Sequence, residues 1–349
     1  MSLALAGLLV LSPLWAWHIG AGWPPSLRDN AFKTAAAASV VMIAIASWPL
    51  GILWGLALYH WRDPDDVPQA EFRPSIAGVL AIGTVVGIVL LTAHVSPTNL
   101  GWVRGAILAG GLVQMAILCW QASRLYRERH RGYTYHFWRD SLRGSMGNRV
   151  VTGGYLAFCF ALAPGWLLPV FALGLLATNS FTALAAAALA LAIRYPAWTL
   201  YWAPLMALAV IVCWHWRGHP RDSLAGRWVI WRLCWQSWMG DTWVGRLLGR
   251  GHWAFSRRAR WWHAQGLVRD IYSQAHQDAL QFLLEYGAVG LLAVLAFLVL
   301  LTRGMGLGDP WTAALATGLV VGMNQFTLHL PHTGLPVVVT AGVLWGRIA

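Results

Sequence analysis

Long apolar runs separated by short polar breaks make up most of the chain. A helix that spans a membrane needs about 20 mostly apolar residues, and eight runs approach that length. They are 3–19, 34–59, 75–93, 103–121, 198–213, 284–302, 311–329 and 333–347. The apolar stretch 150–194 is interrupted twice, and three shorter helices are predicted there: 151–163, 166–179 and 181–194. The pattern predicts an all-α, polytopic transmembrane bundle of about eleven helices.

The composition supports the same class of protein. Apolar residues make up 58% of the chain and charged residues 11%, whereas soluble domains carry roughly 45–50% and about 25%. This excludes an ordinary cytosolic enzyme, a disordered chain and a disulfide scaffold. Continuous apolar runs disfavour an outer-membrane barrel, whose strands alternate polar and apolar residues. The four cysteines lie apart without metal-site spacing, so neither zinc nor a disulfide framework is indicated.

Two polar regions divide the chain and hold 17 of its 25 basic residues. Region 122–149 contains seven Arg and region 214–283 contains ten. The predicted organisation is N-terminal transmembrane helices, a basic loop, central transmembrane helices, a large Arg- and Trp-rich loop, and C-terminal transmembrane helices. Their bounds are 1–121, 122–149, 150–213, 214–283 and 284–349.

The charge of these regions leaves their side of the membrane open. An even number of predicted helices lies between them, so both face the same side, together with the acidic loop 60–74. The positive-inside rule would place them in the cytoplasm, but it weakens for loops longer than about 60 residues. All basic residues except Lys33 are Arg. Arg suits bidentate contacts with phosphate or carboxylate, although a biased genome explains the preference as well.

A polar segment directly before the run 284–302 carries candidate chemistry. It contains His276-Gln277-Asp278 and leads through Glu285 to Gly287. We expect a helix that begins near His276, with His276 and Gly287 on one face. The free N–H groups of a first turn attract anions and disfavour a second positive charge, which would keep His276 neutral and able to accept a proton. The alternative is a surface histidine that caps a helix.

This segment resembles the His-Asn-x-x-Leu-Gln-x-x-x-Glu-x-Gly-x-x-Gly signature of the bacterial O-antigen ligase and O-antigen polymerase superfamily, with Gln277 where Asn is usual. Four further landmarks of that family occur in the same order. They are Gly144-Ser145-Met146-Gly147-Asn148, Gly226-Arg227 with Trp231, Gly249-Arg250-Gly251 with Phe255, and Leu330-Pro331-His332. The resemblance covers roughly residues 144–349, and residues 1–143 contribute only hydrophobicity.

The resemblance implies a GT-C-like, multi-pass protein of the bacterial inner (cytoplasmic) membrane whose active site faces the periplasm. It places 122–149, 214–283 and the acidic loop 60–74 on the periplasmic side, against the positive-inside expectation for 122–149. The implied partners are a glycan carried on undecaprenyl pyrophosphate, a lipid or glycan acceptor, and membrane lipids. No nucleic acid is expected.

The implied reaction is transfer of that glycan to an acceptor hydroxyl, without metal or cofactor. His276 would accept a proton from the attacking hydroxyl or orient it. The donor pyrophosphate would be bound by arginines, led by Arg227 and Arg250 and helped by Arg149 or Arg143. The supporting residues would be Gln277, Glu285 and Trp231. The plainer interpretations are an interfacial Arg227 that reaches lipid headgroups and an Arg250 that merely occupies a turn.

One departure from the family pattern leaves alternatives open. Phe181 stands where the family carries an Arg that helps to hold the lipid pyrophosphate. Either Arg143 or Arg149 supplies the charge, or the donor differs, or the protein is inactive. The alternatives to a ligase are therefore a repeat-unit polysaccharide polymerase with the same donor, and a non-catalytic transporter or polysaccharide-assembly subunit.

Overall fold

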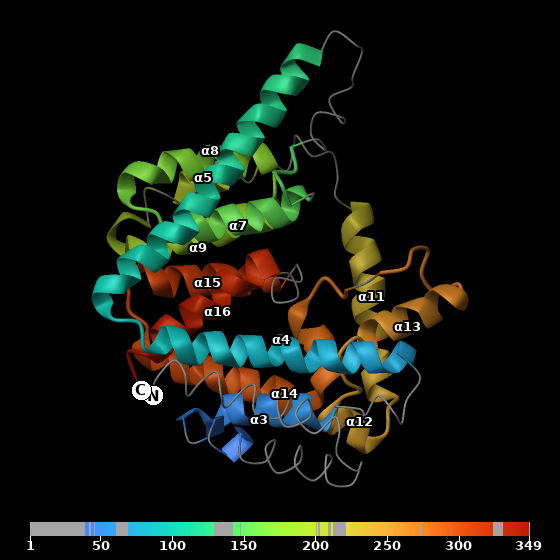
Figure 1. Ribbon diagram of the computed structural model, residues 1–349. Coiled ribbons are helices and arrows are strands. Elements are labelled where there is room, and N and C mark those ends of the chain that lie inside the picture. The colour runs from blue at the N-terminus through green and yellow to red at the C-terminus, as the bar shows by residue number, and fades with distance from the viewer. Residues whose placement is uncertain are drawn as a thin grey trace. The chain divides into compact units, whose positions relative to one another are not determined.

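The computed structural model describes most of the chain as helices. The described residues are 39–41, 43–44, 46–60, 69–128, 142–146, 148–199, 201, 203–208, 211, 221–272, 274–323 and 331–348, with backbone only at 69–80, 221–225 and 331–332. Over these ranges the regular elements are α-helices and short 3-10 helices, without a strand (Figure 1). The predicted all-α class is confirmed.

The chain divides into two compact units, each described here by itself. Unit 1 comprises Met1–His94, Arg227–Gly304 and Trp345–Ala349. Unit 2 comprises Val95–Gly226 and Met305–Leu344. Each unit therefore joins parts of the chain that lie far apart in the sequence.

Unit 1 is built around one long helix. Its elements are α3 (Trp48–Tyr59), α4 (Gln69–Ala93), α11 (Arg221–Met239), α12 (Trp243–Leu248), α13 (Ala254–Ala264), α14 (Asp278–Leu301) and the 3-10 helix η5 (Thr302–Gly304). Helix α14 packs against both α3 and α12, and α3 packs against α4 (Figure 1). The helices of residues 221–264 are thereby attached to the start of α14.

A buried apolar cluster joins α11, α13 and α14 in unit 1. Helix α13 contributes Phe255, Ala259 and Trp262, whose spacing places them on one face. Helix α11 contributes Ile230 and Cys234 to the same cluster. Burying a large apolar side chain contributes roughly 1.5–3 kcal/mol, so this cluster fixes the position of the segments that carry the candidate site.

Unit 2 is a bundle packed through small residues. Its elements are α5 (Pro97–Glu128), α7 (Arg149–Leu162), η3 (Gly165–Leu167), α8 (Leu168–Thr178), α9 (Phe181–Arg194), η4 (Pro196–Trp198), α15 (Pro310–Gly322) and α16 (Pro331–Trp345). Helices α7, α9 and α15 pack against one another. A side chain at Gly154 of α7 would lie 2.9 Å from Val321 of α15, so the small residue permits the close contact.

Several predicted boundaries are confirmed and two are corrected. The three helices predicted within 150–194 correspond to α7, α8 and α9, and Asn179 adopts the left-handed conformation (φ 46°) that ends α8. The region 214–283, predicted as a large Arg- and Trp-rich loop between transmembrane helices, contains the helices α11, α12 and α13, which the apolar pattern did not predict. The predicted helix 34–59 is interrupted at Ser47, where α3 begins with Pro49 in its first turn. The predicted helix 3–19 lies outside the described residues.

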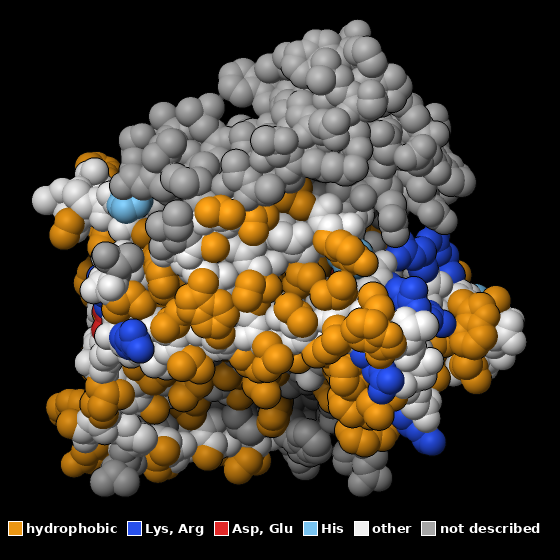
Figure 2. Space-filling view, turned by 90° about the horizontal axis from the view of Figure 1, so that it is seen from below, with side chains coloured by type: hydrophobic (Ala, Val, Ile, Leu, Met, Phe, Trp, Pro, Cys, Tyr) orange, Lys and Arg blue, Asp and Glu red, His pale blue; other side chains and the backbone are white. Residues whose placement is uncertain are grey.

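Two described helices are long and apolar enough to cross a membrane, judged by length and composition: Pro97–Arg127 and Asp278–Gly304. Further apolar helices are shorter, with 10–17 residues. Both long helices expose large apolar side chains, such as Trp102 (81% exposed) and Val299 (66% exposed). Hydrophobic side chains also cover much of the described surface on the face drawn in Figure 2. Exposed apolar area of this extent is typical of surfaces that meet another apolar phase.

Candidate functional site

The centre of the candidate site is a crossing of two backbone segments in unit 1. Helix α14 breaks at Gly287 (φ 69°, ψ −171°). The N–H groups of Arg250 and Gly251 donate to the carbonyls of Leu284 (3.1 Å) and Glu285 (2.9 Å) before that break. The landmark Gly249-Arg250-Gly251 is therefore hydrogen-bonded directly to the landmark that contains Glu285 and Gly287.

Both glycines at this crossing are required by space and by conformation. A Cβ at Gly287 would lie 2.3 Å from the carbonyl oxygen of Leu247, and a Cβ at Gly249 would lie 2.3 Å from that of Glu285. Gly249 also has a positive φ of 80°. Glycine alone tolerates such φ values at little cost and lets two backbones approach this closely.

Glu285 lies beneath the crossing and is 1% exposed. Its Oε1 accepts from the N–H of Trp253 (3.2 Å) and from Nε2 of Gln281 (3.2 Å). Its Oε2 lies 3.4 Å from Nδ1 of His252. Hydrogen bonds of this kind offset the cost of burying a carboxylate. Glu285 therefore supports the site by connecting α14 to the start of α13.

His276 does not lie in the first turn of α14, so that prediction is wrong. The helix begins at Asp278, and Gln277 is its N-cap, with the side-chain Oε1 of Gln277 accepting from the N–H of Leu280 (2.7 Å). His276 precedes the cap and adopts the left-handed conformation (φ 55°). It therefore shares no helix face with Gly287. Gln277, predicted as a supporting residue, is the N-cap of α14 in the structure.

Side chains from two helices hold the residue before His276. Nε1 of Trp231 on α11 donates to the carbonyl of Ala275 (3.0 Å), and Oε1 of Gln281 on α14 accepts from the N–H of Ala275 (3.0 Å). Trp231 was predicted to support the site. Gln281 was missed, although its i, i+4 spacing to Glu285 was a visible signal.

Arg227 and His276 interact electrostatically in unit 1. Burial lowers the pKa of the half-buried Arg227 guanidinium, which still remains charged at neutral pH. Burial, and second the positive charge of Arg227, lower the pKa of His276 to about 4. His276 is therefore neutral near pH 7, as expected. The cause is burial beside Arg227 rather than the helix end, because His276 lies outside the helix.

Arg250 is occupied by a neighbouring carboxylate. Its Nε donates to Oδ2 of Asp241 (2.8 Å), and its Nη2 forms a second short contact with Oδ1 of Asp241. This guanidinium holds the pKa of Asp241 below its usual range. Half of the Arg250 side chain is exposed. Arg250 is therefore a less direct candidate for pyrophosphate than the sequence indicated.

Arg143 and Arg149 lie in unit 2, on either side of a capped turn. Oε1 of Gln121 accepts from the N–H groups of Arg143 (3.1 Å) and Gly144 (3.0 Å). The side chain of Asn148 accepts from the N–H of Val150 and caps α7, of which Arg149 is the first residue. The Arg143 side chain is exposed. The structure thus places both arginines at the amino end of α7, as the landmark predicted.

Phe181, at the position of the family Arg, is the first residue of α9. Oγ of Ser180 accepts from the N–H of Ala183 (3.4 Å) and caps this helix. The segment 178–181 is a tight turn between α8 and α9. The departure from the family pattern is therefore a change of side chain at an ordinary helix start.

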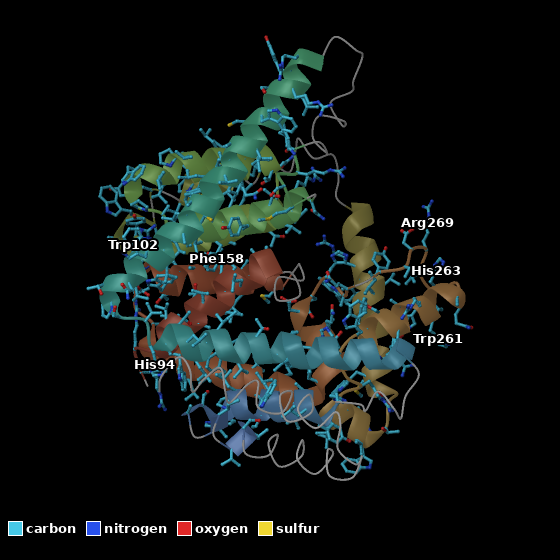
Figure 3. The ribbon with its side chains drawn as sticks, viewed as in Figure 1. His94, Trp102, Phe158, Trp261, His263 and Arg269 are labelled. Carbon is cyan, nitrogen blue, oxygen red and sulfur yellow. The ribbon has the colours of Figure 1, made fainter. Side chains whose placement is uncertain are left out.

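Helix α13 turns a basic and aromatic face outwards. Trp261 and His263, with Arg269 beyond the helix, project away from the apolar cluster of unit 1 (Figure 3). The side chains of Arg257 and Arg260 are exposed as well. This face is therefore an exposed basic and aromatic surface of unit 1.

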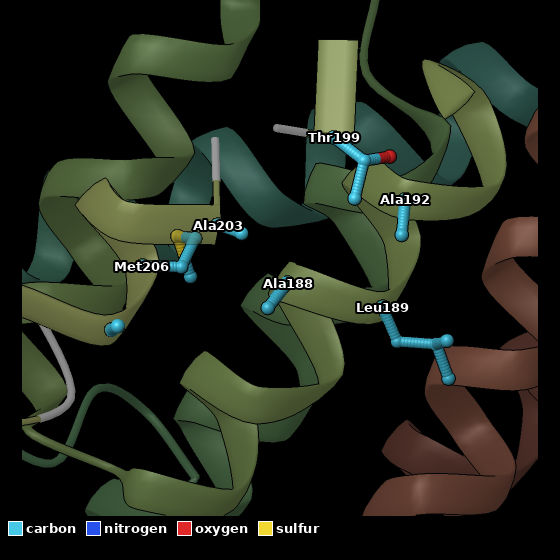
Figure 4. A pocket seen from close by; sticks show the side chains of 7 residues that line it. Ala188, Leu189, Ala192, Thr199, Ala203 and Met206 are labelled. Atoms are coloured by element: carbon cyan, nitrogen blue, oxygen red, sulfur yellow. The ribbon is translucent and has the colours of Figure 1, made fainter. Parts of the chain in front are cut away.

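Other potential sites are less informative. A pocket of about 330 Å³ in unit 2 is lined by apolar side chains and Thr199, without a titratable group (Figure 4). Within the described ranges no cluster of three or more His, Cys, Asp or Glu side chains is arranged to hold a metal ion. Asp63 and Asp65, two closely spaced carboxylates of the acidic loop, lie outside those ranges.

Comparison with known proteins adds no relative. The sequence matches no protein-family model, and a search of curated proteins finds no match either. The resemblance to the O-antigen ligase and polymerase superfamily therefore depends on the five sequence landmarks.

Proposed function

We propose that this chain is an inner-membrane glycosyltransferase of the O-antigen ligase type. It would move a glycan from undecaprenyl pyrophosphate to an acceptor hydroxyl on the periplasmic side. The observation that carries the proposal is the turn that presents His276: the residue before it is held by Trp231 and Gln281, and His276 itself has a positive φ of 55°. The half-buried Arg227 lies on the same helix as Trp231, and its charge acts on His276. Displacement of a pyrophosphate requires one group that handles the acceptor hydroxyl and another that binds the anion.

In the proposed reaction the acceptor oxygen attacks the anomeric carbon of the donor glycan. A new C–O bond forms, and the bond between that carbon and the pyrophosphate oxygen breaks, with the electron pair leaving on the oxygen. His276 takes the hydroxyl proton. Arg227 stabilises the negative charge on the departing pyrophosphate. The family resemblance implies inversion at the anomeric carbon.

The remaining features fit this assignment. Two long apolar helices, α5 and α14, suit a chain embedded in a membrane, and the number of about eleven crossings comes from the apolar runs of the sequence. The exposed arginines of α13 suit a surface that meets an anionic lipid carrier. A metal ion is not required, because guanidinium groups neutralise the leaving group. A His276 held by constrained neighbours, with the charge of Arg227 acting on it, favours an enzyme over a non-catalytic assembly subunit, despite Phe181.

The test is genetic and uses the native host. The gene is deleted and complemented with wild type, His276→Ala, or the matched control His263→Ala, which removes an exposed histidine of α13. Surface polysaccharide and the undecaprenyl-linked pool are then measured. We expect His276→Ala to behave as the deletion at wild-type protein levels, and His263→Ala to behave as wild type.

The accumulated material distinguishes the acceptors. Long lipid-linked chains without attachment to the final acceptor identify a ligase. Single repeat units on the carrier identify a polymerase, the alternative with the same donor. Complementation by His276→Ala, or a deletion that changes neither pool, contradicts the catalytic assignment and favours the assembly subunit.

A further inference from the structure

Gln281 is a buried amide placed between a charge and the turn that presents His276. It lies on α14 one turn before Glu285 and is 3% exposed. Its Nε2 donates to Oε1 of Glu285, and its Oε1 accepts from the N–H of Ala275. An amide turned the other way would place its oxygen against a carboxylate and its NH₂ against an N–H. The hydrogen-bonding partners therefore fix the orientation of this amide.

The residue that Gln281 holds is fixed on both sides. Ala275 is completely buried. Its N–H is held from α14 by Gln281, and its carbonyl is held from α11 by Trp231. The carbonyl of Ala275 belongs to the peptide that leads into His276. The two contacts therefore fix the backbone from which the imidazole projects.

His276 needs such support because its conformation is unfavourable. A left-handed conformation at a residue with a side chain is uncommon and persists when surrounding contacts determine it. On the other side of His276, the cap formed by Gln277 holds the chain to the start of α14. The left-handed residue therefore lies between two constrained neighbours.

We propose that Gln281 is a positioning residue for His276. It transmits the position of the buried Glu285 carboxylate to the Ala275 peptide, and thereby sets the direction in which the imidazole is presented to the substrate. This inference rests on the proposed function where it concerns catalysis. The placement of the imidazole can be measured separately.

Three changes at this position separate a positioning role from simple packing. Gln281→Met keeps the length of the side chain but removes both hydrogen bonds. Gln281→Glu keeps an acceptor for the N–H of Ala275 but sets a second carboxylate against Glu285. Combining Gln281→Glu with Glu285→Gln removes that repulsion and supplies an amide that can donate to residue 281. The double variant should therefore recover part of what Gln281→Glu loses.

The chain also offers a matched pair of tryptophans on α11. Trp231 donates to the carbonyl of Ala275, and Trp238 donates to the carbonyl of Arg246, each at 3.0 Å. Trp231→Phe removes a bond to the turn before His276. Trp238→Phe removes the same kind of bond elsewhere on the same helix. We expect Trp231→Phe, like Gln281→Met, to raise the rate of chemical modification at His276, and Trp238→Phe to leave it unchanged.

The first measurement is independent of activity. The purified full-length chain is modified with diethyl pyrocarbonate over a pH series, and modification at His276 is quantified by mass spectrometry, with His263 as internal reference. The charged and aromatic groups described near His276 are Arg227 from α11 and Tyr272 from the preceding segment. We expect Gln281→Met to raise the rate at His276 and to move its titration midpoint toward 6.5, because the turn loosens and hydrates.

The second measurement is transfer with the lipid-linked glycan extracted from the deletion strain as donor. We expect kcat to fall about a hundredfold in Gln281→Met, the loss typical of a misplaced catalytic group, with the donor KM unchanged. Wild-type reactivity of His276 in Gln281→Met and in Trp231→Phe would overturn the inference. If Gln281→Met does not fold, Gln281→Glu with and without Glu285→Gln decides. Altered reactivity in a chain whose wild type transfers no glycan would support the positioning role and contradict the proposed function.

Discussion

Glutamine side chains hold the turn before a helix in both units, but they connect the two turns to different partners. In unit 1 the turn before α14 is held by Gln281, and in unit 2 the turn before α7 is held by Gln114 and Gln121. Gln114 accepts from the N–H of Ser145 (3.0 Å) and donates to the hydroxyl of the same residue (2.6 Å). Both hydrogen bonds of the Gln114 amide are therefore made to one residue, Ser145, whereas the Gln281 amide connects Ala275 to the buried carboxylate of Glu285.

The arginines near the two sites also differ in burial. Arg227 is half-buried and depresses the pKa of a histidine in its own unit, whereas Arg143 is exposed. A charge interacts more strongly where water is excluded, because the effective dielectric constant is lower. Burial and connection to other buried groups, rather than the mere presence of Arg or His near a helix start, therefore distinguish the stronger candidate site.

The largest difference in the free energy of unfolding is expected between alanine substitutions at two glycines with positive φ, Gly287 and Gly144. A Cβ at Gly287 would meet the backbone oxygen of Leu247, whereas a Cβ at Gly144 would meet only side-chain atoms of Gln114 and Thr152. We expect Gly144→Ala to cost roughly 1–2 kcal/mol for the conformation, and in addition the displacement of the Gln114 and Thr152 side-chain atoms, which would lie 2.7–2.9 Å from the new Cβ. Gly287→Ala should add an overlap penalty of typically 1–3 kcal/mol. Thermal unfolding of the purified chain measures both, and equal losses would contradict the backbone crossing.

The next contrast compares Arg227 on α11, whose charge acts on His276, with Arg143 at the turn before α7. We expect Arg227→Ala to lower transfer about a hundredfold, as loss of a charge-stabilising donor typically does, and Arg143→Ala to lower it much less. The dependence of transfer on pH gives a second, directional prediction. Neutral His276 is the active form, so wild-type transfer should hold from pH 7 to 5 and decline as the pH falls through about 4. Removing Arg227 raises that pKa, so the decline should begin at higher pH.

Burial remains in Arg227→Ala and keeps the midpoint below 6.5, because it is the larger cause of the depressed pKa. If the pH at which transfer declines stays the same in Arg227→Ala, the charge of Arg227 does not influence the titration of His276 during transfer. A greater loss in Arg143→Ala than in Arg227→Ala would reverse the comparison and make the unit 2 turn the donor site.

The smallest effect is expected at the ion pair of Arg250, half of whose side chain is exposed, with Asp241, whose side chain is 8% exposed. Water screens the charge of the exposed partner, so Arg250→Ala should change the free energy of unfolding by only about 1 kcal/mol. Because Arg250 is bound to Asp241, we also expect transfer to stay close to wild type. Asp241→Asn serves as the companion variant. A large loss of transfer in Arg250→Ala alone would restore the pyrophosphate role that the sequence indicated.

The sequence predicted features that depend on local pattern. The three helices of 150–194 follow from apolar runs and two visible breaks, and the glycines at 249 and 287 were found as landmarks. The position of His276 outside α14 was not predictable from spacing, because a histidine and a glycine eleven residues apart also fit one continuous helix. The break at Gly287 becomes visible only with the segment that crosses it.

The contacts around His276 required tertiary structure. Gln281 and Trp231 lie fifty residues apart, and their convergence on Ala275 depends on how α11 packs against the start of α14. The helices within 214–283 were missed because Arg and Trp on exposed and buried faces obscure the apolar periodicity. The pairing of Arg250 with Asp241 depends on the turn between α11 and α12.

The backbone crossing also constrains how the chain is made. The carbonyls of Leu284 and Glu285 are satisfied by N–H groups of Arg250 and Gly251. A buried backbone carbonyl without a partner costs free energy comparable to a lost hydrogen bond, so the start of α14 is incomplete until the 249–251 segment has packed against it. That segment precedes α14 in the chain, so the donors are synthesised before the carbonyls that they satisfy.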